Sequence, residues 1–371
     1  MLIGVPREVK IEEYRVGLTP YSVRELVKRG HKIIVEHNAA SAINFTDEAY
    51  VAVGATIVDT AESLYQQAEM IVKVKEAQPS EYRLLREGQI LFTYLHLAPD
   101  PKQAEALIKS GCIAIAYETV TDNEGGLPLL LPMSQVAGRL AIQAGAHCLE
   151  KPSGGSGILL GGVAGVCPGK VTVIGAGVVG TNAVCMAIGK KAQVTVLDKS
   201  LRRLQKLDFQ FGGRLNTSYA TDGSIEQCVM DADLVVGAIL VPGQAAPKLV
   251  SRELLKRMRP GSVMIDVAID QGGCFETSRP TTHKEPTYVI DDIVHYCVTN
   301  MPGAVPRTST LALNNATLPF VVALADKGYR KAFLDDSHLL NGLNVYRGNL
   351  THEGVAYDLK RDFTPSLMLL N

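Results

Sequence analysis

The chain has 371 residues, of which 46% are apolar, so it is long and apolar enough for two globular domains and is not a disordered polymer. Its formal net charge is −1 and its basic residues are scattered, which argues against a nucleic-acid-binding surface or a polybasic membrane face. The sequence shows no signal peptide, no apolar run long enough for a membrane span and no C-x-x-C pair among its seven cysteines, which predicts a cytoplasmic protein with reduced thiols.

Short apolar strands alternate with helical patterns over the first 130 residues, which predicts a parallel α/β sheet. Helices are expected after the capping residues Thr19, Thr46 and Asp100. Strands are expected at residues 2–5, 32–36, 70–76, 89–96 and 112–118. Ligands of parallel sheets gather beyond the carboxyl ends of the strands, so residues 73–76, 94–96 and 117–118 are candidate site residues.

An alanine-rich amphipathic helix over residues 133–150 is expected to carry the chain from one domain into the other. It is followed by residues 153–169, which contain seven glycines. This stretch lacks the Gly-Lys-Ser/Thr ending of a phosphate-binding loop, because Val171 follows Lys170. We interpret it as a mobile connector or a subunit contact.

The stretch from Val171 to Asp198 has the pattern of a dinucleotide-binding site. A β-branched strand leads directly into Gly175, Gly177 and Gly180, and a second strand ends on Asp198. The glycines allow a tight turn, close approach of a pyrophosphate and close packing of helix on strand. Asp198 can accept hydrogen bonds from the adenosine ribose, and its charge favours NAD over NADP. The alternative interpretation is an ordinary structural turn.

Further strands are expected at residues 216–220, 233–240, 263–270 and 288–300, which suits the doubly wound strand order 3-2-1-4-5-6. A second alanine-rich helix over 307–325 would return the chain to the first domain, where strand-like residues 342–350 and 352–359 would pack. The predicted fold is therefore two-domain α/β. A Rossmann domain over 134–303 would be inserted in a substrate domain made of 1–133 and 304–371, with the active site in the cleft between them.

Four side chains could supply chemistry, and each has an ordinary structural interpretation as well. His96 ends a strand and suits proton transfer, or is a core histidine bonded to a carbonyl. Arg15 suits a substrate carboxylate, or is a solvated charge. Asp270 ends a strand of the cofactor domain, or caps a turn. Lys75 by itself is more typical of a surface lysine.

The motifs resemble a known family over nearly the whole chain. GVPREVKIEEYRVGLTP from Gly4, with GAGVVG from Gly175, is similar to alanine dehydrogenases and to the NAD-binding subunit of proton-pumping transhydrogenases. Several further motifs resemble the alanine dehydrogenase branch: LHLA around His96, MSQVAG from Met133, LLGGVAGVCPG, DVAIDQGG around Asp270 and NMPGAVPRTST. The resemblance implies NAD-dependent conversion of L-alanine to pyruvate and ammonium by a homohexamer.

The resemblance also implies residue roles. Arg15 and Lys75 would hold the substrate carboxylate and carbonyl, His96 would be the general acid/base, and Asp270 would orient the reacting water or amine. The substrate pocket would be walled by Tyr94, Leu130 and Met133. The NAD site would comprise Ser134, Gly175, Gly177, Val178, Val179, Gly180, Asp198, Arg203, Ala220, Ile239, Leu240, Val267, Ala268, Ile269, Asp270, Val298, Thr299, Asn300 and Met301.

Some positions depart from the family pattern. Ala220 stands where serine is expected, so only a backbone contact remains there, and Arg203 stands where lysine is common. Some relatives carry Glu and His as a proposed metal pair at the positions of Ala323 and Lys327, so we expect no metal.

Three alternatives remain open at this level. A catalytically silent transhydrogenase subunit would need no amino-acid clamp such as Lys75, His96 and Asp270. A saccharopine- or opine-type dehydrogenase would need a longer pocket than the expected Leu130 and Met133 wall allows. A structural NAD-binding scaffold would need an interaction stripe or tail, which the chain does not offer.

Overall fold

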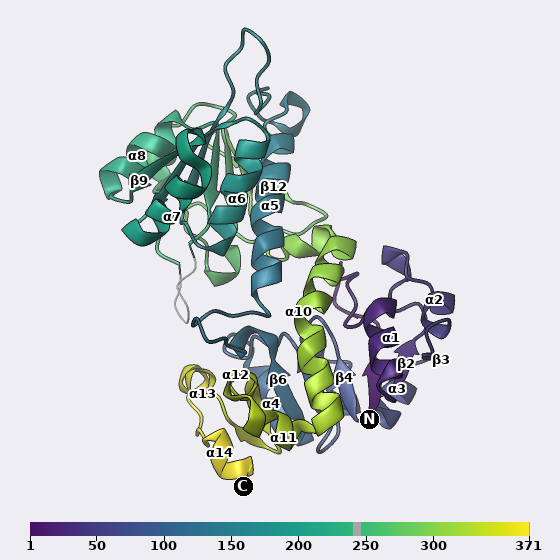
Figure 1. The fold of residues 1–371 in the computed structure, drawn as a ribbon. Coiled ribbons are helices and arrows are strands. Elements are labelled where there is room, and N and C mark those ends of the chain that lie inside the picture. The colour runs from purple at the N-terminus through teal and green to yellow at the C-terminus, as the bar shows by residue number, and fades with distance from the viewer. Residues whose placement is uncertain (240–245, 371) are drawn as a thin grey trace. The chain divides into compact units, whose positions relative to one another are not determined.

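The computed structural model describes residues 1–239 and 246–370 and divides into two compact units (Figure 1). Unit 1 combines Met1–Pro132 with Val305–Asn371, and unit 2 is Met133–Ala304. Each unit contains one sheet, of eight strands in unit 1 and seven in unit 2. The predicted α/β class is therefore confirmed.

The sheet of unit 1 has the order β15-β14-β6-β5-β4-β1-β2-β3. Its strands are β1 Leu2–Val5, β2 Lys32–Glu36, β3 Thr56–Val58, β4 Met70–Val72, β5 Ile90–Thr93, β6 Ile113–Ala116, β14 Leu343–Tyr346 and β15 Asn349–Leu350. Strands β1 to β6 pair in parallel, whereas β14 runs antiparallel to β6 and to β15. Every residue of β4, β5 and β6 is buried, as expected for central strands of a parallel sheet covered on both faces.

Helices α1, α2 and α4 of unit 1 begin where the capping residues predict. Thr19, Thr46 and Asp100 each accept a hydrogen bond from a backbone N–H of the first turn. The helices are α1 Pro20–Lys28, α2 Asp47–Val51, α3 Ala61–Gln67, α4 Pro101–Ser110, α10 Pro306–Lys327, α11 Tyr329–Asp335, α12 Ser337–Leu340, α13 Glu353–Leu359 and α14 Ser366–Leu370.

Helix α10 has the length and composition of a membrane span, with a mean hydropathy of 1.2. However, 44% of that window is buried inside the protein, and the core helix of a globular protein passes the same test. Its buried Asn314 and Thr310 accept hydrogen bonds from the backbone N–H groups of Thr19 and Val16. Helix α10 therefore anchors the loop that follows Arg15.

The sheet of unit 2 has the order β12-β13-β11-β10-β7-β8-β9. Its elements are α5 Leu131–Cys148, β7 Lys170–Ile174, α6 Val178–Gly189, β8 Gln193–Asp198, α7 Leu201–Phe211, β9 Leu215–Tyr219, α8 Asp222–Asp231, β10 Leu234–Gly237, α9 Arg252–Leu255, β11 Val263–Asp266, β12 Thr287–Ile290 and β13 Ile293–Tyr296. Taken without β12, this is the predicted doubly wound order 3-2-1-4-5-6. The additional strand β12 pairs antiparallel with β13 at the edge.

Several details differ from the sequence-based expectation. Residues 353–359 form helix α13 and not a strand, and the side chain of His352 caps this helix by accepting from the Val355 N–H. Strand β3 and helix α3 were not predicted. Strand β4 ends at Val72, earlier than predicted, although the N–H of Lys73 still donates to the Phe92 carbonyl of β5. The N–H of Val74 donates to the carboxylate of Glu8.

Candidate functional site

The candidate substrate residues of unit 1 follow neighbouring strands of its sheet. Strands β1, β4, β5 and β6 are adjacent, so the segments beyond their carboxyl ends meet at one edge. Arg15 follows β1, Lys75 follows β4, Tyr94 and His96 follow β5, and Glu118 follows β6. The strand-end rule thus brings together the segments that the sequence singled out.

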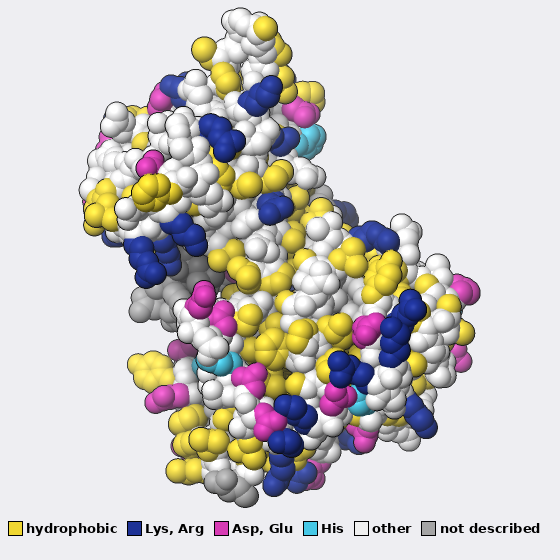
Figure 2. All heavy atoms as spheres, in the orientation of Figure 1, with side chains coloured by type: hydrophobic (Ala, Val, Ile, Leu, Met, Phe, Trp, Pro, Cys, Tyr) yellow, Lys and Arg dark blue, Asp and Glu magenta, His cyan; other side chains and the backbone are white. Residues whose placement is uncertain are grey.

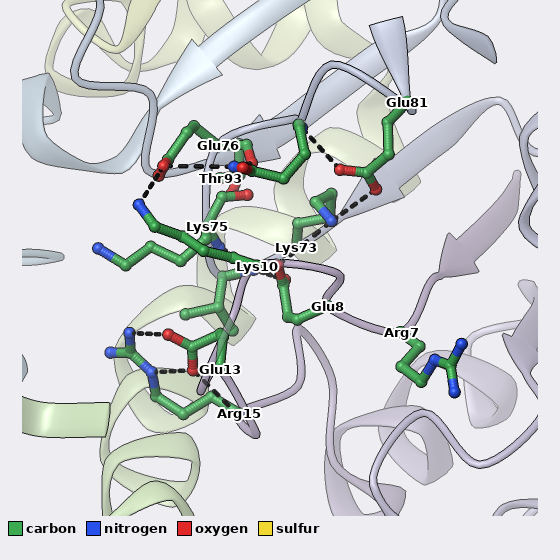
Figure 3. Close-up of polar contacts among 12 residues, drawn as sticks. Arg7, Glu8, Lys10, Glu13, Arg15, Lys73, Lys75, Glu76, Glu81 and Thr93 are labelled. Atoms are coloured by element: carbon green, nitrogen blue, oxygen red, sulfur yellow. Dashed lines mark hydrogen bonds and ion pairs between the residues drawn. The ribbon is translucent and has the colours of Figure 1, made fainter. Parts of the chain in front are cut away.

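Arg15 is buried, which contradicts its interpretation as a solvated charge. Its Nε donates to Glu13 Oε1 and its Nη2 donates to Glu13 Oε2, both at 2.6 Å (Figure 3). This two-point ion pair fixes the plane of the guanidinium. Arg15 is therefore a preorganised cation at the edge of the sheet.

Lys75 is only half-buried, but its surroundings lower the pKa of its ammonium group. Burial is the largest cause, and the positive charge of Arg15 acts in the same direction. Figure 3 shows Lys75 beside Lys10, whose ammonium group pairs with Glu76. The carboxylates of Glu76 and Glu13 oppose this lowering of the pKa, and a further carboxylate beside Lys75 would stabilise its ammonium group in the same way.

A buried charge cluster lies next to Lys75. Lys73 is fully buried, and its Nζ lies 2.8 Å from Glu81 Oε1 and 3.2 Å from Glu8 Oε2 (Figure 3). Burial alone would lower the pKa of Lys73, but the two carboxylates raise it above its ordinary value. The other oxygen of Glu8 accepts from the N–H groups of Val74 and Lys75. Glu8 therefore ties this cluster to the backbone of Lys75, a role that local sequence did not reveal.

Tyr94 and His96 lie on the segment that follows β5. Tyr94 is buried, and its hydroxyl donates to the carbonyl of Leu129 at 2.6 Å, next to the half-buried Leu130. The rings of Tyr94 and His96 are stacked, with centroids 5.8 Å apart and planes 4° apart. The side chain of His96 is 44% exposed, which contradicts its interpretation as a core histidine and leaves the imidazole accessible.

Unit 2 carries the predicted nucleotide-binding turn between β7 and α6. Gly175 has a φ of +107°, which residues with a side chain rarely adopt. A Cβ at Gly180 would lie 1.7 Å from the Gly175 carbonyl oxygen. A Cβ at Gly177, in contrast, would meet no atom within 4 Å. The first glycine thus makes the turn, the third allows helix and turn to touch, and open space remains at the second. These features fit a pyrophosphate at the N-terminus of α6.

Asp198 ends β8 beside this turn. Its Oδ2 accepts from the N–H of Ala176 and its Oδ1 from the N–H of Ser200, both at 2.7 Å. Arg203 is exposed, with Nη1 3.8 Å from Oδ2. Because each carboxylate oxygen can accept a second hydrogen bond, Asp198 can hold the turn and bind ribose hydroxyls together.

The expectation that Asp270 ends a strand is wrong, because β11 stops at Asp266 and the exposed Asp270 lies in the following short 3-10 helix, Ile269–Gln271. Asp266, fully buried at the end of β11, accepts from the N–H groups of Ala268 and Cys274 and from the hydroxyl of Ser278. Asp266 thereby folds the loop that carries Asp270. Asp266 is the first residue of the motif Asp-Val-Ala-Ile-Asp, but only its hydrogen bonds in the structure reveal that it shapes the loop.

The remaining predicted cofactor residues all lie in unit 2. Val178, Arg203, Asp270 and Thr299 are exposed; Ser134, Val179, Ile239, Val267 and Asn300 are half-buried; and Ala220, Ala268, Ile269, Val298 and Met301 are buried. Met133, predicted to wall the substrate pocket, is buried in α5. Leu240 lies outside the described residues. Among residues 1–239 and 246–370, no group of three His, Cys, Asp or Glu side chains could hold a metal ion.

Two family models together match most of the chain. The alanine dehydrogenase/PNT N-terminal domain matches residues 4–137, and the alanine dehydrogenase/PNT C-terminal domain matches residues 141–353. The alanine dehydrogenases of Halomonas elongata and Mycolicibacterium smegmatis are 58% and 52% identical over 370 residues, covering 100% of this chain and of each relative.

Solved structures give the same grouping. An L-alanine dehydrogenase superposes with a TM-score of 0.94 at 51% identity, covering 97% of this chain and 99% of that one. A transhydrogenase from Sinorhizobium meliloti has a TM-score of 0.82 at 20% identity, covering 94% of this chain and 100% of that one. The second likeness establishes a shared fold and nothing further.

Proposed function

The chain belongs to the alanine dehydrogenase family, and we propose on that premise that it catalyses the reversible oxidative deamination of L-alanine to pyruvate and ammonium with NAD. The family resemblance expected from the motifs is confirmed. The observation that carries the activity is high identity to alanine dehydrogenases over the full chain. The transhydrogenase alternative is weaker, because that likeness is limited to the fold.

The family implies a nicotinamide cofactor, and we propose NAD in particular. The turn at Gly175, Gly177 and Gly180 would hold the pyrophosphate, and Asp198 would accept from the ribose hydroxyls. The carboxylate of Asp198 would repel the 2′-phosphate of NADP. When bound, the nicotinamide supplies the acceptor for the hydride that leaves Cα of alanine.

The charges of unit 1 support a clamp for a small carboxylate. Arg15 is oriented by Glu13, and Lys75 has its pKa lowered beside it, so an anion would relieve the repulsion between the two cations. In the proposed complex Arg15 and Lys75 hold the carboxylate and carbonyl of the substrate. Tyr94, Leu130 and Met133 line the rest of the pocket and restrict it to a small side chain.

His96 and Asp270 are proposed to handle protons and water. Loss of hydride from the neutral amine leaves an iminium ion, to which water adds; the resulting carbinolamine then collapses to pyruvate and ammonia. His96 moves protons in the last two steps, for which an exposed imidazole is suited. Asp270 orients the water or the amine.

The test is an assay of NADH formation with single L-amino acids at alkaline pH, together with NADH oxidation by pyruvate plus ammonium. We expect L-alanine to be the preferred small amino acid and the rate to rise with pH, since only the uncharged amine releases hydride. The His96→Ala variant should lose turnover and keep NADH binding. Retained kcat in this variant would remove His96 from the mechanism, and activity with no L-amino acid would refute the proposed function.

We also propose a cytoplasmic homohexamer, as the family resemblance implies, and the surface of unit 2 supports self-association. Residues 153–169 form an arm that extends beyond the helices of the unit, where Val163 and Val166 pair across its tip (Figure 1). Leu159, Val163 and Val166 are 67%, 62% and 62% exposed, and Figure 2 shows hydrophobic side chains along this arm. Exposed apolar side chains of this kind mark interaction surfaces. Light scattering of the Val163→Asp/Val166→Asp variant should show a smaller assembly than the parent; an unchanged mass would exclude the arm from the interface.

A further inference from the structure

Glu118 follows the carboxyl end of strand β6, where ligands of parallel sheets gather, but neither the family resemblance nor the proposed mechanism gives it a role. It lies in the short 3-10 helix Tyr117–Thr119, directly after β6. Its side chain is only 15% exposed. A carboxylate this sheltered needs partners, and its partners lie on the segment after β5.

The carboxylate of Glu118 accepts hydrogen bonds from two successive backbone N–H groups. Leu95 N–H points at both oxygens, at 3.2 Å each, and His96 N–H donates to Oε1 at 2.5 Å. Hydrogen bonds to an ionised acceptor are about twice as strong as neutral ones. Glu118 therefore fastens the backbone of His96 to the end of β6.

The backbone that Glu118 holds is in an uncommon conformation. His96 has a φ of +48°, in the left-handed region that residues other than glycine rarely occupy. Such conformations persist only where the surroundings impose them, and they cluster at active sites. Here two residues hold this backbone: Glu118 accepts from its N–H groups, and the buried Gln103 donates from Nε2 to the Leu95 carbonyl at 2.9 Å.

Glu118 also faces the ring of His96. Its Oε1 lies 3.7 Å from His96 Nδ1, while the ring face stacks on Tyr94. The charge of Glu118 reaches two other titratable groups as well. Burial lowers the pKa of His352 and the charge of Glu118 opposes that shift, whereas burial and Glu118 both raise the pKa of Tyr94.

We propose that Glu118 is a positioning residue for His96: it holds the His96 backbone in its left-handed conformation and faces Nδ1, so that Nε2 is directed to the substrate. The inference rests on the proposed role of His96 as the general acid/base. In the proposed complex Glu118 touches neither substrate nor cofactor, and its effect passes through His96 alone.

The test compares substitutions at position 118 with a matched control. Glu118→Ala removes both the backbone bonds and the charge, whereas Glu118→Gln keeps an oxygen that can accept both N–H groups. The control is Asp336→Ala, because Asp336 Oδ1 likewise accepts from two successive N–H groups, those of His338 and Leu339, at 2.9 and 3.2 Å. All variants are assayed for kcat, KM for pyruvate, NADH binding and melting temperature.

We expect Glu118→Ala to lower kcat about 10- to 100-fold, the scale of a misplaced catalytic group. KM for pyruvate and Kd for NADH should stay within about threefold of the parent, because ground-state binding is not affected. Glu118→Gln should recover most of the lost kcat, and Asp336→Ala should lower the melting temperature with kcat unchanged. Should the alanine variant fail to fold, Glu118→Asp decides, since it keeps the charge but withdraws the carboxylate by one methylene and should lose more kcat than Glu118→Gln.

The proposal is overturned if Glu118→Ala keeps kcat within about threefold of the parent, or if Asp336→Ala loses as much. It is also overturned if Glu118→Gln recovers nothing, because then backbone bonding is not its contribution. His96→Ala measured in parallel separates the two levels of inference. If His96→Ala is active, the proposed mechanism is contradicted. If His96→Ala is inactive and Glu118→Ala is fully active, only the positioning role of Glu118 is contradicted.

Discussion

The cofactor preference depends on Asp198, and replacing this residue by alanine should weaken NADH binding strongly. In the structure both oxygens of the carboxylate already accept from backbone N–H groups at 2.7 Å, one of them in the glycine turn itself. The substitution therefore removes the acceptor for the ribose and also the tie between β8 and the turn.

The expected magnitude follows from these contacts. A hydrogen bond to a charged group contributes about 1.5–3 kcal/mol. Losing one such bond to the ribose corresponds to a rise of about 10- to 150-fold in Kd, since each 1.4 kcal/mol is a factor of ten. Loss of the Ala176 bond adds to this by loosening the turn. At saturating NADH, kcat should change little, because the reacting groups are elsewhere.

The assay is a fluorescence titration of NADH and NADPH against the parent, Asp198→Ala and a control. The control is Asp231→Ala, which removes a carboxylate of the same unit that pairs with Lys170 on the surface. The Asp198 variant should lose NADH affinity and narrow its preference for NADH over NADPH, since the repelling charge is gone. A Kd for NADH within about threefold of the parent would refute the assignment of Asp198 to the cofactor site.

Three further predictions concern stability and pH. Lys73→Met leaves two buried carboxylates without their cation and should lower the free energy of unfolding in urea by about 3–5 kcal/mol. The pKa of Lys75 lies below the ordinary value of 10.5, and only the protonated amine binds a carboxylate. KM for pyruvate should therefore rise as the pH increases through this pKa, which steady-state kinetics at a series of pH values measure. Gly180→Ala places a Cβ against the Gly175 carbonyl and should weaken NADH binding in the same titration and lower the melting temperature.

Each of these three predictions is compared with a control substitution in the same protein. Lys170→Met removes an exposed lysine and should leave the urea midpoint unchanged, so an equal loss in both lysine variants would contradict the buried-cluster argument. Lys75→Arg should abolish the alkaline rise in KM, since arginine stays charged. If the rise persists in this variant, a group other than Lys75 causes it. Gly189→Ala, where a Cβ meets no atom within 4 Å, should bind NADH normally.

The elements that the sequence predicted well are those with short-range causes. Thr19, Thr46 and Asp100 cap helices through bonds to residues three positions on, and the pattern of three glycines forces the turn between β7 and α6. The doubly wound strand order follows from alternating strands and helices joined by right-handed crossovers. The strand predicted at residues 352–359 was wrong: helix α13 lies there, with His352 as its N-cap and Val355 and Ala356 buried.

Residue roles were predicted only where a motif carried them. From position alone, Lys75 was more typical of a surface lysine and Arg15 was open to both interpretations; the family resemblance assigned both residues to the substrate. The structure gives the physical reason: burial beside Glu13 orients Arg15, and burial beside Arg15 lowers the pKa of Lys75. Neither effect is visible in local sequence, since both depend on desolvation by the packed unit.

By itself, then, the sequence determined the two α/β sheets, the nucleotide-binding turn and the strand ends where chemistry gathers, because hydrophobic period, capping and glycine spacing act over a few residues. Only the tertiary structure decided which charges meet. Glu8 reaches the segment of Lys75 from 66 residues away, and Glu118 reaches His96 across 22 residues. Contacts of that kind depend on strand order and burial, so they exist only once the sheet has assembled.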